Sequence, residues 1–488
     1  MHFDDVLRQS FTRRGLLKVG AAGALASQVA WVPERMAFAA TTLPDIQFDI
    51  GNFIPPAFTV NGVQVRFGPV YTLFVPAKLT RNPTRTDQAT LAGALNTIEA
   101  NLPFSPSGVF TFVAYGLPYF RRLPSTLVSS RIPRLRSNTS RSVLEEAVPS
   151  PTDVVPGNGI TKETYNVPVR IENNDLLFTL RSDSLNNLGT VLGFLESRLP
   201  FLSFQTARLM FQQIGITRQV ANAVGLPYRT RINPQSPMWM GFADQQTNAA
   251  GPAQIVTFVG NASAHLTTAF AGTYFDNGSI QHLSHVIQDL AQFYATPQQD
   301  PPAGETYQER LQYMFRSNQR GTRDGLISDG NADQFTDGGG PSFLPNTFQG
   351  TGDALANINV NGTVFNPATG AGTFQGQHRM GHIAALQRSS RAADGTPVHI
   401  RMDGAGYDNM DVPDGSNQPK LQFTAFVPTA EFFRAMRANT AALDIIAATG
   451  NLVADDDNGL ERFIMATRRQ NFLVPPRRHR AFPLLELV

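Results

Sequence analysis

Three adjacent stretches decide the fold: "VYTLFVPA" (70–77), "DQATLAGALNTIEANL" (87–102) and "GVFTFVAYG" (108–116). The outer two are short runs rich in β-branched and aromatic residues, which is typical of buried strands. The middle stretch repeats apolar residues at helical spacing behind an aspartate, Asp87, that can cap the helix. The sequence therefore predicts a strand–helix–strand unit of the kind that builds α+β folds.

The same alternation continues along the chain. A strand predicted at 175–183 is followed by predicted helices at 184–198 and 203–222. The stretches 277–295 and 420–450 each begin with strand-like residues and continue with a helical pattern. We therefore expect both halves of the chain to contribute strands and helices to an α+β fold.

Two long segments have little periodicity. Residues 122–174 are rich in Arg, Ser and Pro, and residues 296–376 are dominated by Gly, Asp, Asn, Pro and Gln. Both are predicted to be loops, and the second is long enough to be an insertion or a functional cover. The chain of 488 residues is long enough for two domains, which we place at 41–248 and 249–488.

The bulk composition excludes several classes of protein. The formal net charge of +2 is too balanced for a surface that binds nucleic acid or an anionic membrane. The absence of cysteine excludes disulfides, thiolate nucleophiles and thiolate metal ligands. No nucleophile-elbow pattern of a hydrolase and no phosphate-binding P-loop pattern occurs in the sequence.

The N-terminus carries a targeting signal. Residues 10–40, "SFTRRGLLKVGAAGALASQVAWVPERMAFAA", place the arginine pair Arg13–Arg14 before a short apolar stretch and a small-x-small cleavage site near Ala39. This arrangement predicts a twin-arginine signal peptide over residues 1–40, recognised by the twin-arginine export machinery. We expect the mature protein to be periplasmic or secreted, without a stable membrane anchor, because no other stretch approaches ~20 apolar residues.

With cysteine absent, histidine is the natural residue for metal binding. His282 and His285 lie three apart on a predicted strand and therefore point to opposite faces. In "QGQHRMGHIAALQRSSR" (375–391), His378 and His382 are four apart and could share a helix face, but the glycine between them favours a helix that begins at His382. A single inward histidine without a carboxylate cluster suits an axial haem ligand better than a zinc site, although a buried core histidine is the alternative.

In the segment "MGFADQQTN" (240–248), the carboxylate Asp244 follows an apolar run that ends at Phe242 and Ala243. Taken alone, Asp244 is best interpreted as a turn residue, since aspartate often caps turns through its own side chain. The other interpretation is an acid held in a pocket for chemistry.

Seven segments, in order along the chain, resemble those of dye-decolourising (DyP-type) haem peroxidases. They are "MGFADQQTN" (240–248), "NGSIQHLSHVIQDLAQF" (277–293), "MFRSNQRG" (314–321), "GHIAALQR" (381–388), "VHIRMDGAGY" (398–407), "LQFTAFVP" (421–428) and "FLVPP" (472–476). The resemblance implies two ferredoxin-like halves with antiparallel sheets, of the dimeric α+β barrel superfamily. It also implies a haem b cofactor, contacted by Arg316, and reduction of hydrogen peroxide through a ferryl intermediate with oxidation of dyes, phenolics or other one-electron donors.

The same resemblance assigns roles to individual residues. His382 is implied as the proximal ligand of the haem iron, and Asp244 and Arg401 as the residues above the open iron position. Asp244 would transfer the peroxide proton, and Arg401 would stabilise developing negative charge. Leu421 and Phe423 would wall the cavity and exclude water.

Several alternatives stay open at this stage. Arg388 and Arg391 lie near Arg401 in the sequence and could take its place. Trp239 and Tyr407 could relay electrons from large donors, although aromatic packing is the better explanation of both. A haem-handling, deferrochelatase-like protein and an exported binding protein without catalysis are the alternative functions, and the oligomeric state is open.

Overall fold

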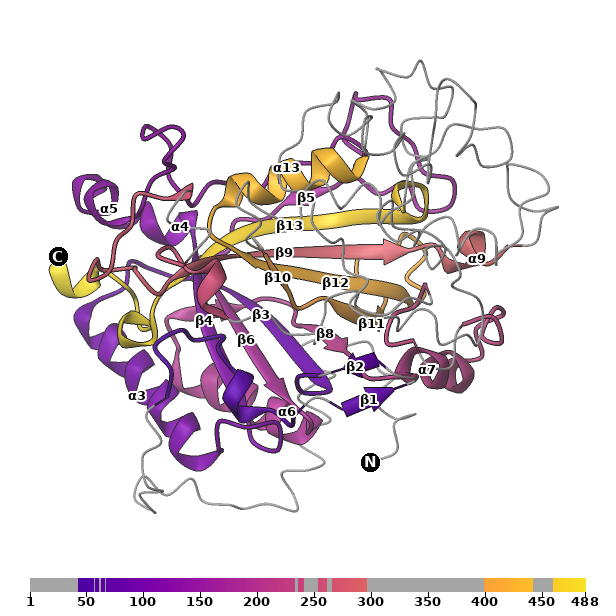
Figure 1. The fold of residues 1–488 in the computed structure, drawn as a ribbon, viewed down its shortest axis with the longest axis horizontal. Helices are drawn as coiled ribbons and strands as arrows, with labels where there is room; N and C mark the ends of the chain where they lie inside the picture. Colours follow the sequence, from indigo (N-terminus) through magenta and orange to yellow (C-terminus); the bar gives the residue numbers. More distant parts are fainter. Residues whose placement is uncertain are drawn as a thin grey trace.

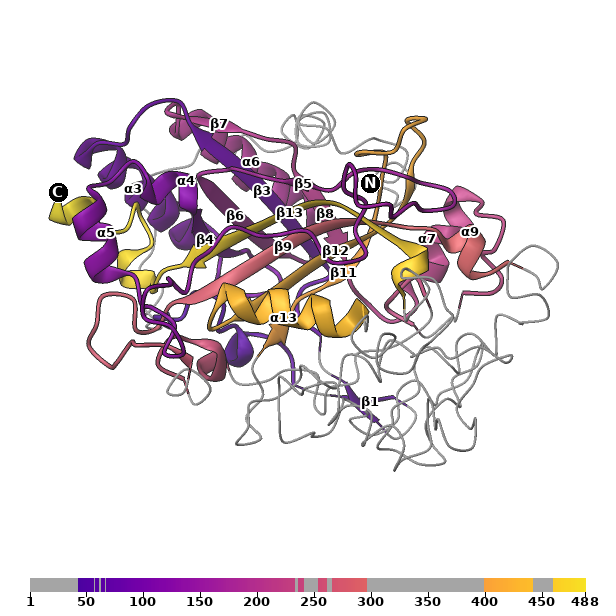
Figure 2. The same ribbon diagram turned by 90° about the horizontal axis from the view of Figure 1, so that it is seen from above.

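The computed structural model describes residues 43–56, 58–60, 63–65, 67–232, 236–240, 253–260, 266–295, 399–441 and 460–488. These residues form a large, mostly antiparallel sheet with helices packed against it (Figures 1 and 2). The predicted α+β class is confirmed.

The strands come from both halves of the chain. The first half contributes β3 (Tyr71–Leu79), β4 (Phe110–Gly116), β5 (Arg170–Ile171), β6 (Leu176–Ser182), β7 (Leu202–Phe204) and β8 (Arg208–Phe211). The second half contributes β9 (Ser279–Gln288), β10 (Ile400–Arg401), β11 (Gly404–Asp408), β12 (Gln418–Val427) and β13 (Ile464–Val474). A separate pair, β1 (Phe58–Val60) and β2 (Val63–Val65), forms its own two-stranded sheet.

The strand pairing of the large sheet closes on itself. It runs from β12 through β11, β8, β3, β6, β4, β13 and β9, and β9 pairs again with β12. The two halves meet at short junctions: Ala405 pairs with Phe211, and β13 pairs antiparallel with the end of β4 and parallel with β5. A closed path leaves few unpaired strand edges, which favours a stable sheet.

The helices are α3 (Arg85–Asn101), α4 (Leu117–Phe120), α5 (Ser125–Arg131), α6 (Leu185–Arg198), α7 (Ile216–Val224), α9 (Leu290–Phe293) and α13 (Ala430–Ala441). Short 3-10 turns occur at Gly51–Phe53, Ala253–Val256, Glu461–Phe463, Arg477–His479 and Leu485–Leu487. Helices α3 and α6 pack on one face of β3, β4 and β6, and α13 packs on β9 and β12 (Figure 2). Thr429 caps α13, since its Oγ1 accepts a hydrogen bond from the Phe432 amide at 3.3 Å.

The two largest clusters of the described core lie on opposite faces of the strands, which are buried on both sides. One face packs against the helices, and the opposite faces of the two halves pack on each other through Phe74, Phe112, Leu177, Leu283 and Phe426. Burial on both faces explains why the opening stretches of the sequence are almost continuously apolar. Each fully buried side chain of this kind contributes about 1.5–3 kcal/mol to the free energy of unfolding.

The predicted strand–helix–strand unit at 70–116 is confirmed, with one change at the helix start. Helix α3 begins at Arg85, and Thr84 is its N-cap. Asp87 lies at the third helical position and accepts a hydrogen bond from the Thr84 amide at 2.8 Å, which completes a capping box.

The helix predicted at 203–222 was wrong over most of its length. Residues 202–211 form β7 and β8, which pair with β3, and only Ile216–Val224 is helical. All four residues of β8 are buried, and a short run buried on both faces has no period that separates strand from helix. The segment 122–174 is mostly irregular as predicted, apart from α5 and β5, and the predicted insertion 296–376 lies outside the described residues.

Candidate functional site

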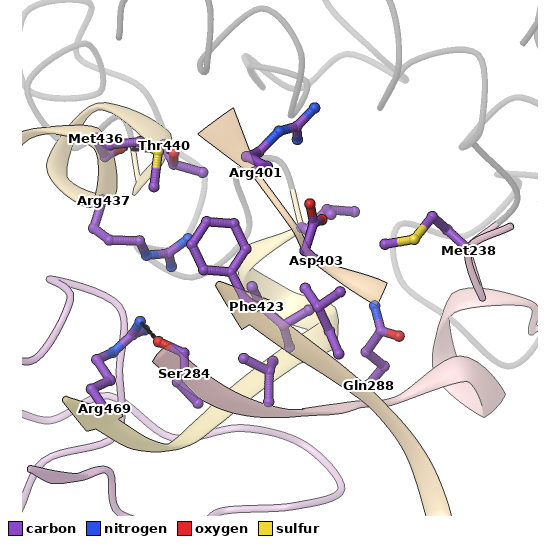
Figure 3. Close-up of a pocket in the computed structure, with 15 residues that line it drawn as sticks. Met238, Ser284, Gln288, Arg401, Asp403, Phe423, Met436, Arg437, Thr440 and Arg469 are labelled. Atoms are coloured by element: carbon purple, nitrogen blue, oxygen red, sulfur yellow. Dashed lines mark hydrogen bonds between the residues drawn. The ribbon is translucent and has the colours of Figure 1, made fainter. Parts of the chain in front are cut away.

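A pocket lies between α13 and the face of the sheet formed by β9, β12 and β13 (Figure 3). Its floor is largely apolar and its sides carry charged groups. The described residues that line it are Met238, Ser284, Val286, Gln288, Arg401, Asp403, Leu421, Phe423, Met436, Arg437, Thr440, Leu460, Ile464, Ala466 and Arg469.

The register of the strands explains which side chains share the face of the sheet that borders the pocket. Phe423 is opposite Ser284, and Ser284 is opposite Arg469. The pairing of β10 and β11 with β12 keeps one register, so Asp403 lies opposite Phe423. Directly opposed residues of antiparallel strands point to the same face. One row across four strands therefore carries an acid, an aromatic ring, a hydroxyl and a guanidinium.

Arg469 is held rigidly at one end of this row. Its Nε and Nη2 donate to the two carboxylate oxygens of Asp153 at 2.7 and 2.8 Å, and its Nη1 donates to Ser284 Oγ at 2.8 Å (Figure 3). Burial would raise the pKa of Asp153, but the charges of Arg469 and Arg437 and the Ser150 amide outweigh it and lower that pKa below its usual value. Asp153 is therefore ionised, and the buried guanidinium has a partner.

Arg437 projects from α13 at the same end of the pocket as Arg469 (Figure 3). Its Nη2 donates to Oε1 and Oε2 of Glu461 at 3.0 and 2.9 Å, and Glu461 is itself buried. Its Nε is buried and has no hydrogen-bond partner within the part of the chain that the structure describes. Leaving a buried donor unpaired costs about 1–3 kcal/mol. A pocket ligand that accepted a hydrogen bond from this N–H would remove that cost.

His282 and His285 point to opposite faces of β9, as their spacing predicts, and both are fully buried. His282 stacks on Phe433 of α13, with ring centroids 3.3 Å apart, while His285 lies on the face away from α13 near Asp408. Burial and the charge of Arg469 lower the pKa of His282 well below its usual value, so it is neutral. Neither histidine lines the pocket.

Met238 enters the pocket next to a well-anchored tryptophan. Trp239 is buried, donates from Nε1 to the Gly406 carbonyl at 3.0 Å, and lies 6.5 Å from Tyr407 between ring centroids. Packing accounts for both aromatic residues, and an electron-relay role stays a prediction. The anchor holds Met238, six residues before Asp244, against the pocket (Figure 3).

The structure brings three of the sequence-predicted site residues together. Arg401, Leu421 and Phe423 line the same pocket. The other three predicted residues, Asp244, His382 and Arg316, lie outside the described residues, as do the alternatives to Arg401, which are Arg388 and Arg391.

Sequence reasoning missed four charged residues at this site. They are Asp153, Arg437, Glu461 and Arg469. Arg469 had a weak signal, since it lies within a run of polar residues, 467–471, between apolar ends that are typical of a buried strand. Asp153 had none, because it lies in the irregular segment 122–174 and meets Arg469 across 316 residues of sequence.

Within the described ranges, no group of three or more His, Cys, Asp or Glu side chains could hold a metal ion. Over the same ranges, none of the helices has both the length and the apolar character needed to cross a membrane.

The model of the DUF7405 family, a family of unknown function, matches residues 69–337 and 341–476, which is more than half of the chain. The chain belongs to this family. No curated protein matches the sequence.

Solved structures of DyP-type peroxidases are similar to this DUF7405 chain. A putative DyP-type peroxidase from Shewanella oneidensis is 14% identical with a TM-score of 0.45, covering 86% of this chain and 96% of its own. A dye-decolorizing protein from V. cholerae is 12% identical with a TM-score of 0.43, covering 89% and 98%. A dye-decolorizing peroxidase from Bacteroides thetaiotaomicron is 13% identical with a TM-score of 0.45, covering 88% and 97%. These structures come from the family that the sequence motifs resemble.

Proposed function

We propose that this chain is a haem-dependent peroxidase of the DyP type, which reduces hydrogen peroxide and oxidises dyes, phenolics or other one-electron donors. The observation that carries the proposal is that Arg401, Leu421 and Phe423 share one pocket with Met238. Six residues span at most about 20 Å of extended chain, so Asp244 is within reach of the pocket that contains Met238.

The pocket's described residues fit a haem group. Haem is a flat apolar ring that carries two carboxylates, and the floor formed by Leu421, Phe423 and Val286 is apolar. The buried Nε of Arg437, unpaired within the described residues, suits a carboxylate, since charge-assisted hydrogen bonds are about twice as strong as neutral ones. The described lining contains no histidine. We therefore assign the role of iron ligand to His382, which lies outside the described residues.

The bound haem would supply the redox chemistry of its iron, and the residues of the chain would prepare the peroxide for it. Asp244 would accept a proton from the peroxide, a role that contributes ~100- to 10,000-fold in rate. Arg401 would stabilise the resulting negative charge in a pocket from which Leu421 and Phe423 exclude water. Arg316 and Arg437 would contact the haem itself.

The finer architecture and the location belong to the same proposal. We assign the chain to the dimeric α+β barrel superfamily, with ferredoxin-like domains at 41–248 and 249–488. The shortness of the junctions between the halves of the closed sheet supports this assignment. Export through the twin-arginine machinery, with cleavage near Ala39, rests on the N-terminal sequence alone.

Titration of the full-length chain with ferric haem, followed at the Soret band, tests the proposal. We expect saturation at one haem per chain for the wild type and for the control variant His378→Ala, and loss of binding for His382→Ala. The Asp244→Asn variant should bind haem and react slowly with peroxide.

Two other outcomes identify the alternatives. A chain that binds haem but does not react with peroxide is a haem-handling protein of the deferrochelatase-like kind. A chain without a Soret band at any haem concentration is a binding protein without haem chemistry, and this result would sink the proposal.

A further inference from the structure

Helix α5 and the turns around it form a strongly basic segment. Residues 121–141 contain six arginines and no acidic residue, although the formal net charge of the whole chain is only +2. The balanced bulk composition therefore conceals a local excess of positive charge. Helix α5 lies at one end of the molecule, and α7 lies towards the other end (Figures 1 and 2).

Three of the six arginines form no ion pair with a carboxylate among the described residues. They are Arg131 and Arg136, which are exposed, and Arg134, which is half-buried and donates to backbone carbonyls. The other three are matched by carboxylates: Arg121 by Glu146, Arg122 by Asp175, and Arg141 by Glu145 and Glu431. Three positive charges are thus available to an anionic partner.

An exposed aromatic side chain lies next to these arginines. Phe270 is 70% exposed, and it follows a segment, 266–268, that runs beside 134–136 through an isolated bridge between Leu135 and Thr267. Leu135 is buried in the core, so the arginines on either side of it point outward. Phe270 is three residues beyond the bridge, which places it about 10 Å or less from Thr267.

The turn that carries Phe270 is held by hydrogen bonds. Thr273 donates from its amide and from its Oγ1 to the Phe270 carbonyl, at 3.1 and 2.8 Å. Gly272 has a φ of +89°, and its amide donates to Asp276 Oδ2 at 2.9 Å. A single exposed apolar side chain is common on protein surfaces. Here it is presented from an ordered turn beside arginines, and this combination favours the interface of an anionic bilayer.

We propose that the surface formed by Arg131, Arg134, Arg136 and Phe270 docks reversibly on a bilayer of anionic lipids. The guanidinium groups contact lipid phosphates, and the ring of Phe270 enters the boundary between headgroups and acyl chains. A second copy of the chain is a poorer occupant, because an isologous interface would bring the same positive charges together. The contact is peripheral and does not involve the pocket, so it is independent of the proposed function.

A dye placed beside Phe270 tests the inference on the full-length chain. The chain has no cysteine, so one introduced cysteine can be labelled selectively. Ala271→Cys carries a polarity-sensitive dye next to the tip, and Ala223→Cys carries the same dye on exposed α7 as the control. Each labelled chain is titrated with vesicles of phosphatidylglycerol and phosphatidylcholine in equal parts, and with vesicles of phosphatidylcholine alone. Both chains have the same N-terminal segment, so a difference between them reports on the proposed surface.

We expect the dye at 271 to shift its emission to shorter wavelength on the anionic vesicles and not on the neutral ones, while the dye at 223 stays unchanged. Phe270→Ser should remove most of this shift, because the apolar group that enters the bilayer is lost. An unchanged dye at 271 on anionic vesicles overturns the inference. A shift of equal size on both kinds of vesicle overturns it as well, since the arginines then play no part.

Two matched pairs of substitutions test the charges. Arg131→Gln with Arg136→Gln should raise the lipid concentration at half-saturation about 25-fold, since each arginine near an anionic surface contributes about fivefold. Arg198→Gln with Arg229→Gln removes the same charge from exposed positions elsewhere and should leave that concentration unchanged. Equal effects of the two pairs overturn the inference. A dye shift produced by polyglutamate but not by vesicles assigns the surface to an acidic protein and overturns it too.

Discussion

The ion pair between Asp153 and Arg469 gives the sharpest quantitative prediction. The two side chains are 4% and 3% exposed, and the guanidinium donates two hydrogen bonds to the carboxylate. Removing one partner of such a pair leaves an uncompensated buried charge, which costs about 3–5 kcal/mol. We therefore expect Asp153→Ala to lower the free energy of unfolding by about 3–5 kcal/mol.

Urea unfolding followed by tryptophan fluorescence measures this loss, because Trp239 is buried and reports on the pocket region. The control is Glu146→Ala, which breaks the exposed pair with Arg121, whose side chains are 64% and 56% exposed, and should cost about 0–1 kcal/mol. An Asp153→Ala loss as small as that of the control would refute the reasoning. The double variant Asp153→Leu with Arg469→Met should be more stable than Asp153→Ala, since it leaves no buried charge unpaired.

Two further predictions test the packing and the acid response. Gly404→Ala should destabilise the protein by about 1–3 kcal/mol in the same urea assay, because the new methyl group meets Met210, whereas Gly193→Ala in α6 meets nothing within 4 Å and should be neutral or stabilising. Burial would raise the pKa of Glu486, but hydrogen bonds from His479 and Tyr274 outweigh it and lower that pKa to about 2. The stability that Glu486 contributes is therefore present above its ordinary pKa of 4.5 and is lost as the pH falls towards 2. Glu486→Gln should flatten the dependence of the unfolding free energy on pH across that window, and an unchanged pH dependence contradicts the assignment.

Local patterns in the sequence predicted much of the fold. The strand–helix–strand unit at 70–116 could be predicted because the spacing of its apolar residues distinguishes strand from helix within each short stretch. The segment 202–211 was not, because its strand form depends on pairing with β3, more than a hundred residues earlier. The closure of the sheet through Ala405 and Phe211 likewise depends on a contact that no local pattern encodes.

The candidate site divides in the same way. Arg401, Leu421 and Phe423 stand in short motifs that a reader of the sequence can recognise. Buried carboxylates hold Arg437 and Arg469 in place. The partner of Arg437 is 24 residues away, and no spacing rule connects Arg469 to its partner across 316 residues. Charge pairing of this kind is a property of the tertiary structure, so no local sequence pattern predicts it.

The central claim is that this pocket supports peroxide reduction, and a stoichiometric experiment tests it most directly. The full-length chain is loaded with haem, mixed with one equivalent of hydrogen peroxide, and supplied with a one-electron donor whose oxidised form is coloured. We expect each peroxide consumed to oxidise two donor molecules, with a rate that falls at least tenfold in an Arg401→Leu variant. Bound haem that leaves peroxide and donor unchanged would contradict it.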